Sequence, residues 1–309
     1  MAAAGTRSPL FSRHTPGGVF SIESTLLTLG NYWYVDSGAA GKGTTSSFGY
    51  QPDTPFSTLV AAWDSGNLAA GDIVLVAAGH TETVSAAAGM DCDTAGVRVI
   101  GLGTGDQRPT VTLDTDALAD IDIDAANITF QNLRFIANFL DIAAAIDVNA
   151  DGFTALRCEF IDTSAILNAL IWILGATAGT SDRMVVAECE FYAFGTANTA
   201  AVSMPGTPDR CIIRDNIFVG DWGTAAILAA GIITKASILR NVISNLDAGD
   251  NVCINLADTS TGIIAYNGVG GRETDASTDQ ITGGTTMTLI QNYAVDEGDR
   301  SGVLEPAAT

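Results

Sequence analysis

The chain has 309 residues, with 14 Lys and Arg against 35 Asp and Glu, so its formal net charge at pH 7 is −21. This balance excludes proteins that bind the phosphate backbone of a nucleic acid through clustered basic side chains. Apolar residues make up 47% of the chain, yet its longest apolar runs, residues 169–176 and 225–233, are short. A membrane-spanning helix needs roughly 18 to 20 such residues, so neither a nucleic acid nor a membrane is expected as a partner.

Residues 1–30 are predicted to be an extended arm. They carry Arg7, Arg13 and His14 against a single acid, Glu23, so a mildly basic segment precedes an acidic body. Segments of this kind commonly become ordered on a partner, and we expect the three basic residues to dock the chain there. The arm lacks the long apolar stretch of a signal peptide, so synthesis in the cytoplasm without a leader is expected.

Residues 31–70 are predicted to form an N-terminal cap with a short helix. Apolar side chains recur at helical spacing from Phe56 to Trp63, with Asp53 or Thr54 as the expected N-cap and Pro55 as the first helical residue. A helix of this kind would cover the open end of a sheet, where unpaired strands invite edge-to-edge association. Residues 71–79 are then predicted to be the first strand.

A repeat organises the chain from residue 71 to residue 295. Seven short strands end in an apolar residue, and these ends are 25 to 31 residues apart. The ends are Phe135, Phe160, Phe191, Phe218, Ile243, Val269 and Ala294. Strands this short, with Gly, Asn and Asp between them, do not fit helical or leucine-rich repeats. They predict an all-β chain, folded as a right-handed parallel β-helix, which is a solenoid of stacked coils.

Stacking of the coils predicts which side chains form rows along the solenoid. The inward positions two residues before each end hold Leu133, then two cysteines and four asparagines, whose amides are expected to bond one another. These six are Cys158, Cys189, Asn216, Asn241, Asn267 and Asn292. The cysteines are interpreted as buried thiols. The preceding outward positions, Arg157, Glu188, Asp215 and Arg240, predict ion pairs between coils.

Four segments resemble the opening of pectin-lyase-like right-handed β-helix proteins: residues 34–36, 55–59, 71–79 and 99–103. The resemblance spans residues 31–295 and implies the fold. It leaves the function open, because similar openings occur in polysaccharide lyases, surface proteins and bacteriophage virion proteins of the head or tail.

One acidic cluster is a candidate for polysaccharide cleavage, and it comprises Asp114, Asp116, Asp120, Asp122 and Asp124. Asp and Ile alternate over residues 120–124, so three carboxylates would share an exposed face about 7 Å apart, which suits the acid and base of an inverting glycosidase. No lysine lies nearby. A solvated strand face with inward isoleucines is therefore the favoured interpretation, and no catalytic residue is assigned.

Residues 147–152, Asp-Val-Asn-Ala-Asp-Gly, match the first half of a calcium-binding loop. Cys158 stands where that loop needs a bidentate Glu, and the predicted flanks are strands instead of helices. A corner turn built from Asn, Asp and Gly is the favoured interpretation. No metal and no cofactor are expected.

The strand around residues 169–174 is apolar on both faces. Counting from Phe160 places Leu170, Trp172 and Leu174 outward, with Leu228 outward two coils later. An exposed apolar patch of this kind marks an interface, so these four residues predict contacts within a closed homo-oligomer, with a trimer as the expected form.

The sequence thus predicts an arm (1–30), a cap (31–70), a parallel β-helix (71–295) and a C-terminal tail (296–309). The predicted function is that of a non-enzymatic virion protein, a capsid decoration or cement protein of a bacteriophage that docks on the major capsid protein or another virion component. The alternative is a tailspike or surface β-helix protein that binds or cleaves polysaccharide.

Overall fold

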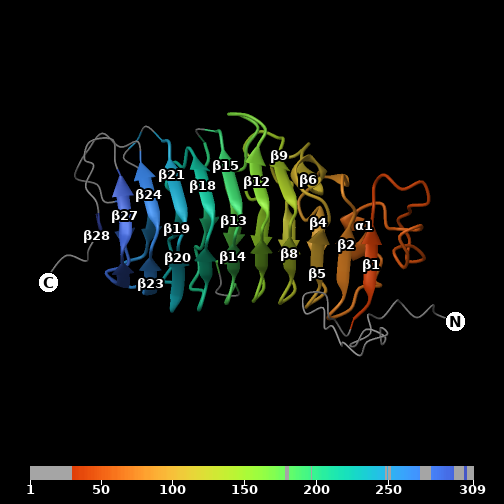
Figure 1. Ribbon diagram of the computed structural model, residues 1–309, viewed down its shortest axis with the longest axis horizontal. Coiled ribbons are helices and arrows are strands. Elements are labelled where there is room, and N and C mark those ends of the chain that lie inside the picture. Colours follow the sequence, from red (N-terminus) through yellow and green to blue (C-terminus); the bar gives the residue numbers. More distant parts are fainter. Residues whose placement is uncertain are drawn as a thin grey trace, which may run out of the picture.

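The computed structural model describes residues 30–177, 181–195, 197–247, 249, 252–271, 280–295 and 303–304. These residues form an all-β parallel β-solenoid of about eight turns, stacked along one axis (Figure 1). The predicted fold class is therefore confirmed at this level. Arg7, Arg13 and His14 of the predicted arm lie outside the described residues, as does most of the predicted tail.

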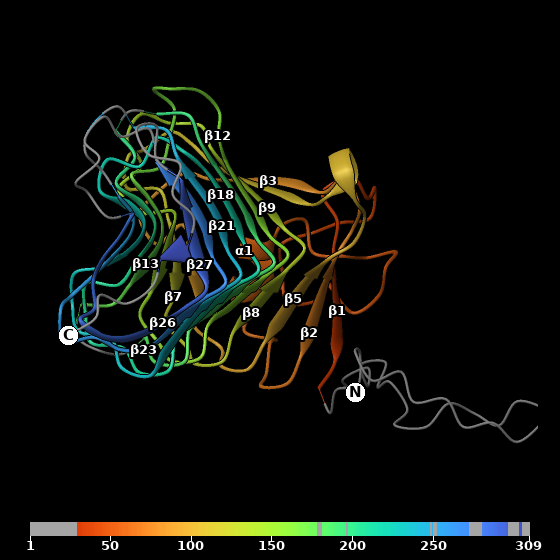
Figure 2. The ribbon, with the colours of Figure 1, turned by 60° about the vertical axis from the view of Figure 1, so that its left-hand side comes forward.

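Three sheets form the walls of the solenoid (Figure 2). Sheet 1 contains β1 (Tyr32–Val35), β2 (Ile73–Val76), β5 (Arg98–Gly101), β8 (Thr129–Gln131), β11 (Thr154–Leu156), β14 (Val185–Ala187), β17 (Ile212–Arg214), β20 (Ala236–Leu239), β23 (Thr261–Ala265) and β26 (Thr286–Ile290). Sheet 2 contains β3 (Thr81–Val84), β6 (Thr110–Leu113), β9 (Arg134–Ala137), β12 (Glu159–Asp162), β15 (Glu190–Ala193), β18 (Ile217–Gly220), β21 (Val242–Asn245), β24 (Gly268–Gly271), β27 (Asn292–Val295) and the antiparallel β28 (Val303–Leu304). Sheet 3 contains β4 (Met90–Cys92), β7 (Ile121–Ile123), β10 (Ile146–Val148), β13 (Ile171–Gly175), β16 (Ala200–Ser203), β19 (Ala225–Ala229), β22 (Val252–Leu256) and β25 (Ile281–Gly283). From β2 to β25, successive strands belong to sheets 1, 2 and 3 in turn, so each of these coils contributes one strand to each sheet.

The predicted repeat is confirmed by the register of sheet 2. Phe135, Phe160, Phe191 and Phe218 lie opposite one another on successive strands and point into the interior. Their rings stack with centroids 5.1, 4.4 and 4.8 Å apart. Because each ring covers the next, this row removes a continuous strip of aromatic surface from water.

The predicted row of asparagines is also confirmed, at the corner between sheets 1 and 2. The side-chain amides of Asn216, Asn241 and Asn267 donate to the Oδ1 atom of the next asparagine along the axis, at 3.0, 3.0 and 2.9 Å. The same row begins with Cys158 and Cys189, where the backbone N–H of Cys158 donates to the Cys189 sulfur. All five cysteines are buried and free. We call this set the asparagine row.

Just before the asparagine row, each coil turns from sheet 1 to sheet 2 through one residue with positive φ. The predicted ion pairs form between these turns: Arg157 Nε lies 2.8 Å from Glu188 Oε2, and Arg240 Nε lies 2.6 Å from Asp215 Oδ1. Both arginines are about half exposed, so the pairs contribute modestly to stability.

The short helix predicted in the N-terminal region is α1 (Leu59–Asp64). Its N-cap is Thr58, whose side chain accepts a hydrogen bond from the backbone N–H of Ala61 at 3.0 Å. The predicted caps Asp53 and Thr54 are wrong because the chain is still extended at Phe56, which donates to the Tyr34 carbonyl. No helix in the described part of the chain is long and apolar enough to cross a membrane.

Candidate functional site

The aspartates of the predicted acidic cluster separate into two groups. β7 places Asp122 on the outer face of sheet 3, with Asp120 and Asp124 on either side of it along the chain. Asp114 and Asp116 lie in the loop after β6, where they accept hydrogen bonds from neighbouring loop residues. Only three of the five therefore share a face, as the alternation of Asp and Ile predicts.

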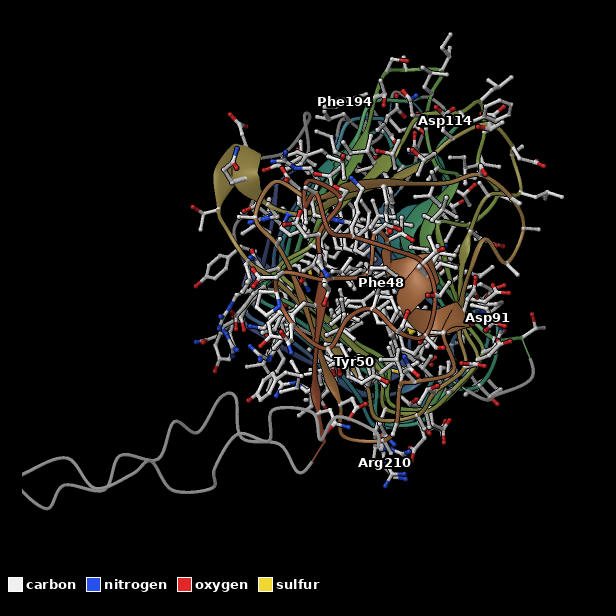
Figure 3. All side chains as sticks on the ribbon, turned by 90° about the vertical axis from the view of Figure 1, so that its right-hand side faces the viewer. Phe48, Tyr50, Asp91, Asp114, Phe194 and Arg210 are labelled. Atoms are coloured by element: carbon white, nitrogen blue, oxygen red, sulfur yellow. The ribbon has the colours of Figure 1, made fainter. Side chains whose placement is uncertain are left out.

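Two further aspartates lie in register with Asp122. β4, β7 and β10 pair so that Asp91, Asp122 and Asp147 are opposite one another on the outer face of sheet 3 (Figure 3 labels Asp91). Adjacent strands are about 4.8 Å apart, so three like charges follow one another closely. From the sequence alone, Asp91 has no predicted role and Asp147 is predicted to lie in a turn. The alternation in Met90–Cys92 is the signal that could have placed Asp91. We call these three residues the aspartate row.

Burial and mutual repulsion disfavour the charged forms of this row. The pKa of Asp122 is raised from its ordinary value of 3.8 to about 6, first by partial burial and then by the nearby carboxylates of Asp120, Asp124 and Asp91. Burial is also the main cause of the raised pKa values of Asp91 and Asp147. The strands of sheet 3 carry no Arg or Lys that would compensate these charges.

Replacing Asp122 with Asn is expected to stabilise the chain at pH 7 by about 1 kcal/mol, a value discounted for the half-exposed position of the side chain. Because the folded pKa is raised, the folded state of the wild type holds the proton more tightly than the unfolded state. The stability that the protonated Asp122 side chain contributes to the wild type is therefore present below about pH 4 and is lost as the pH rises through 6. Urea unfolding midpoints measured from pH 4 to pH 7 check this expectation.

Asp258→Asn is the matched control, since it removes the same charge from an exposed turn after β22. The stability gained by Asp122→Asn should grow between pH 4 and pH 6, whereas that of the control should stay nearly constant. Equal pH profiles for the two variants would contradict the raised pKa of Asp122.

The predicted calcium loop is a corner turn between β10 and β11. The Asp151 carboxylate pairs with Arg183 at 3.4 Å and accepts the backbone N–H of Asp182, while Asn149 donates to Asp124. Gly152 takes a φ of +78°, which favours glycine at the turn. In the described part of the chain, no group of three or more His, Cys, Asp or Glu side chains is arranged to hold a metal ion.

Three of the four predicted interface residues lie on the outside of the solenoid. Leu170, Leu174 and Leu228 are half-buried. Leu174 and Leu228 share one outward column of sheet 3 with Ser203 between them, as the predicted spacing of two coils requires.

The fourth, Trp172, points inward, so its predicted exposure is wrong. Its side chain is fully buried, with its ring centroid 5.6 Å from that of Phe160. Trp172 and Ile173 are both buried although they are consecutive, so the strict alternation counted from Phe160 does not hold at the start of β13. Ala145 and Ala201 occupy the same position on the two adjacent strands and leave room for the indole.

A second apolar surface lies on the loops that join sheet 2 to sheet 3, and the sequence did not predict it. On five coils of the described part of the chain, this loop carries a large apolar side chain that is 46% to 67% exposed. These residues are Leu118, Leu140, Ile166, Phe194 and Leu246. We call them the loop apolar row, and Figure 3 shows Phe194 at the edge of the cross-section. The loops differ in length, so no sequence period indicates the row.

No protein-family model and no curated protein matches the chain. Solved structures do match it, among them two lyases. A rhamnogalacturonan lyase is 12% identical with a TM-score of 0.50, over 89% of this chain and 84% of the lyase. The pectate lyase Bsp165PelA from Bacillus sp. N165, in complex with trigalacturonate, is 12% identical with a TM-score of 0.50, over 90% of this chain and 88% of the lyase.

The chain has the pectin-lyase-like β-helix fold. At 12% identity the likeness establishes the architecture and not the activity. The resemblance stated from the sequence is thus confirmed for the fold.

Proposed function

We propose that the chain is a non-enzymatic structural protein that associates side by side with copies of itself through the loop apolar row. The observation that carries this proposal is the position of five exposed apolar side chains along one corner of the solenoid. Water contact with exposed apolar side chains is unfavourable, and a concentration of them along one side of a protein usually marks a contact surface. Leu174 and Leu228 lie on sheet 3 in the same outward column as the aspartate row, so they are placed outside this contact.

Side-by-side association suits the shape of a β-solenoid. A straight row on one corner can pack against the same row of a neighbour over several coils, and a closed ring of copies covers every row. We propose a trimer as the closed form. The aspartate row would then lie beside the contact, not within it, because its uncompensated charges would be costly to bury.

Cleavage of an acidic polysaccharide has less support. The outer face of sheet 3 carries the aspartate row and no Arg or Lys on its strands, so it repels a uronate chain. Neutral glycans are not repelled in this way, and binding of polysaccharide without cleavage remains compatible with the assembly role.

Decoration of a bacteriophage capsid is the specific form of this role that we propose. The basic residues Arg7, Arg13 and His14 precede a body rich in acids, which suits an arm that docks on the major capsid protein.

We further propose that the coil is right-handed, as nearly all crossovers between parallel strands are, and that α1 with residues 36–58 caps its first turn.

Replacing Ile166 and Phe194 together with Asp is expected to convert the assembly into monomers of 31.8 kDa, because two charges would enter an apolar contact. Light scattering after size-exclusion chromatography measures the mass, and a wild-type mass near three times that value is expected.

Counting copies on intact particles tests the capsid role. Many copies on the head are expected, and a few copies at the tail would contradict it.

Leu102→Asp is the matched control for the assembly. Leu102 is 44% exposed and follows β5 on sheet 1, away from the loop apolar row. This variant should keep the wild-type mass. A wild-type chain that stays monomeric at high concentration, or a double variant that keeps the wild-type mass, would refute the proposed contact.

A further inference from the structure

Two exposed tyrosines lie near one another at the C-terminal end of the corner between sheets 1 and 2. Tyr266 is 52% exposed and Tyr293 is 53% exposed. The register of sheet 2 places Val242, Gly268 and Tyr293 opposite one another on β21, β24 and β27. Tyr266 precedes Gly268 by two residues, so the glycine lies between the two tyrosines. β24 and β27 are neighbours at the blue end of the solenoid (Figure 1).

Gly268 leaves open space at this position. A Cβ atom added there would meet no atom within 4 Å, and its backbone does not adopt the positive φ that favours glycine. Neither packing nor backbone conformation therefore requires glycine here. The missing side chain leaves open space at Gly268, opposite Tyr293 on the adjacent strand and two residues after Tyr266.

Tyr266 also occupies an unfavourable backbone conformation. Its φ is +58°, in the left-handed region that bulky side chains rarely adopt. The other non-glycine residues with positive φ at this corner are all polar in the described part of the chain: Asn132, Arg157, Glu188, Asp215, Arg240 and Gln291. An aromatic residue held in this conformation indicates a role other than turn formation.

Polar side chains occupy the equivalent turns of the neighbouring coils: Asp215 and Arg240 before Tyr266, and Gln291 after it. Asp215 receives two hydrogen bonds from Arg240, at 2.6 and 2.8 Å, and Gln291 is exposed at the next turn after Tyr266. Exposed aromatic faces attract the C–H face of a pyranose ring, and neighbouring amide, carboxylate and guanidinium groups can bond its hydroxyls. Since Arg240 is already paired, the site offers no free cation for an acidic sugar.

We infer that Tyr266 and Tyr293 form a stacking site for a neutral hexose of a polysaccharide, with Gly268 as its floor. The site lies on a different corner from the loop apolar row, so it does not depend on the proposed assembly. A neutral polysaccharide would cross this corner with one ring over the open space at Gly268.

Electrophoresis in native gels that contain a neutral polysaccharide tests this inference, with dextran, galactomannan and glucomannan as probes and polygalacturonate as the acidic comparison. The wild type should be retarded by at least one neutral probe. Retardation should be lost in Tyr293→Ala and in Gly268→Val, which keeps both tyrosines and fills the open space.

Tyr266→Asn separates binding from folding, because Asn tolerates positive φ better than Tyr. It should lose retardation while its melting temperature stays equal or rises. Tyr192→Ala, three coils away on sheet 2, should bind as the wild type does. The inference is overturned if no neutral probe retards the wild type, if only polygalacturonate does, if Gly268→Val binds normally, or if the variants change the oligomer mass instead of binding.

Discussion

Replacing Trp172 with alanine is expected to lower the free energy of unfolding by about 3 to 5 kcal/mol, the usual cost of deleting a large buried aromatic side chain. The indole is fully buried beside Phe160, and Ala145 and Ala201 on the adjacent strands cannot fill the space that it would leave. The urea midpoint followed by far-UV circular dichroism should fall accordingly. The mass of the folded protein should not change, because Trp172 lies in the interior.

Trp172→Phe is the control for this loss. In the described part of the chain the indole Nε1 atom is buried without a hydrogen-bond partner, so a phenyl ring removes an unsatisfied donor while keeping most of the volume. Its cost should stay below about 1.5 kcal/mol. If Trp172→Ala leaves the midpoint unchanged and lowers the oligomer mass, the residue is on the surface, and the inward position is wrong.

The repeat could be predicted because it depends on residues that face the interior. Phe160 and Phe191 lie in the same row and must match in size, and Asn241 and Asn267 must bond each other. Each row therefore restricts which residue can occupy the same position in every coil. The spacing of these residues then appears in the sequence as a repeat. The ion pair of Arg157 with Glu188 follows from the same register.

The surfaces could not be predicted in this way. Ile166 and Phe194 share the loop apolar row, but their loops differ in length, so the chain between them has no fixed period. The aspartate row requires the pairing of β4 with β7, and Asp91 lies in a strand of only three residues. The inward position of Trp172 could not be predicted because Trp172 and Ile173 are consecutive and both buried, so the alternation counted from Phe160 fails at the start of β13.

Asn241→Ala is expected to be at least as damaging as the loss of Trp172, at about 3 to 6 kcal/mol, because each buried polar group left unpaired costs about 1 to 3 kcal/mol. Asn241 is fully buried, and its Oδ1 atom accepts from the backbone and the side-chain amide of Asn216. Its own amide donates to the Ile213 carbonyl and to Asn267. Alanine would leave all four partners with a bond missing inside the solenoid. Urea unfolding measures the loss.

The asparagine row itself supplies the comparison, because Cys158 and Cys189 occupy its first two polar positions. The sulfur of Cys189 accepts one backbone N–H and lies within bonding distance of the Ala155 carbonyl, so a thiol can replace part of what an amide does. Asn241→Cys should therefore be more stable than Asn241→Ala. Asn255→Ala, on the outer face of β22, should cost less than about 0.5 kcal/mol. If all three variants unfold at one midpoint, then volume and not hydrogen bonding sets the stability of this corner.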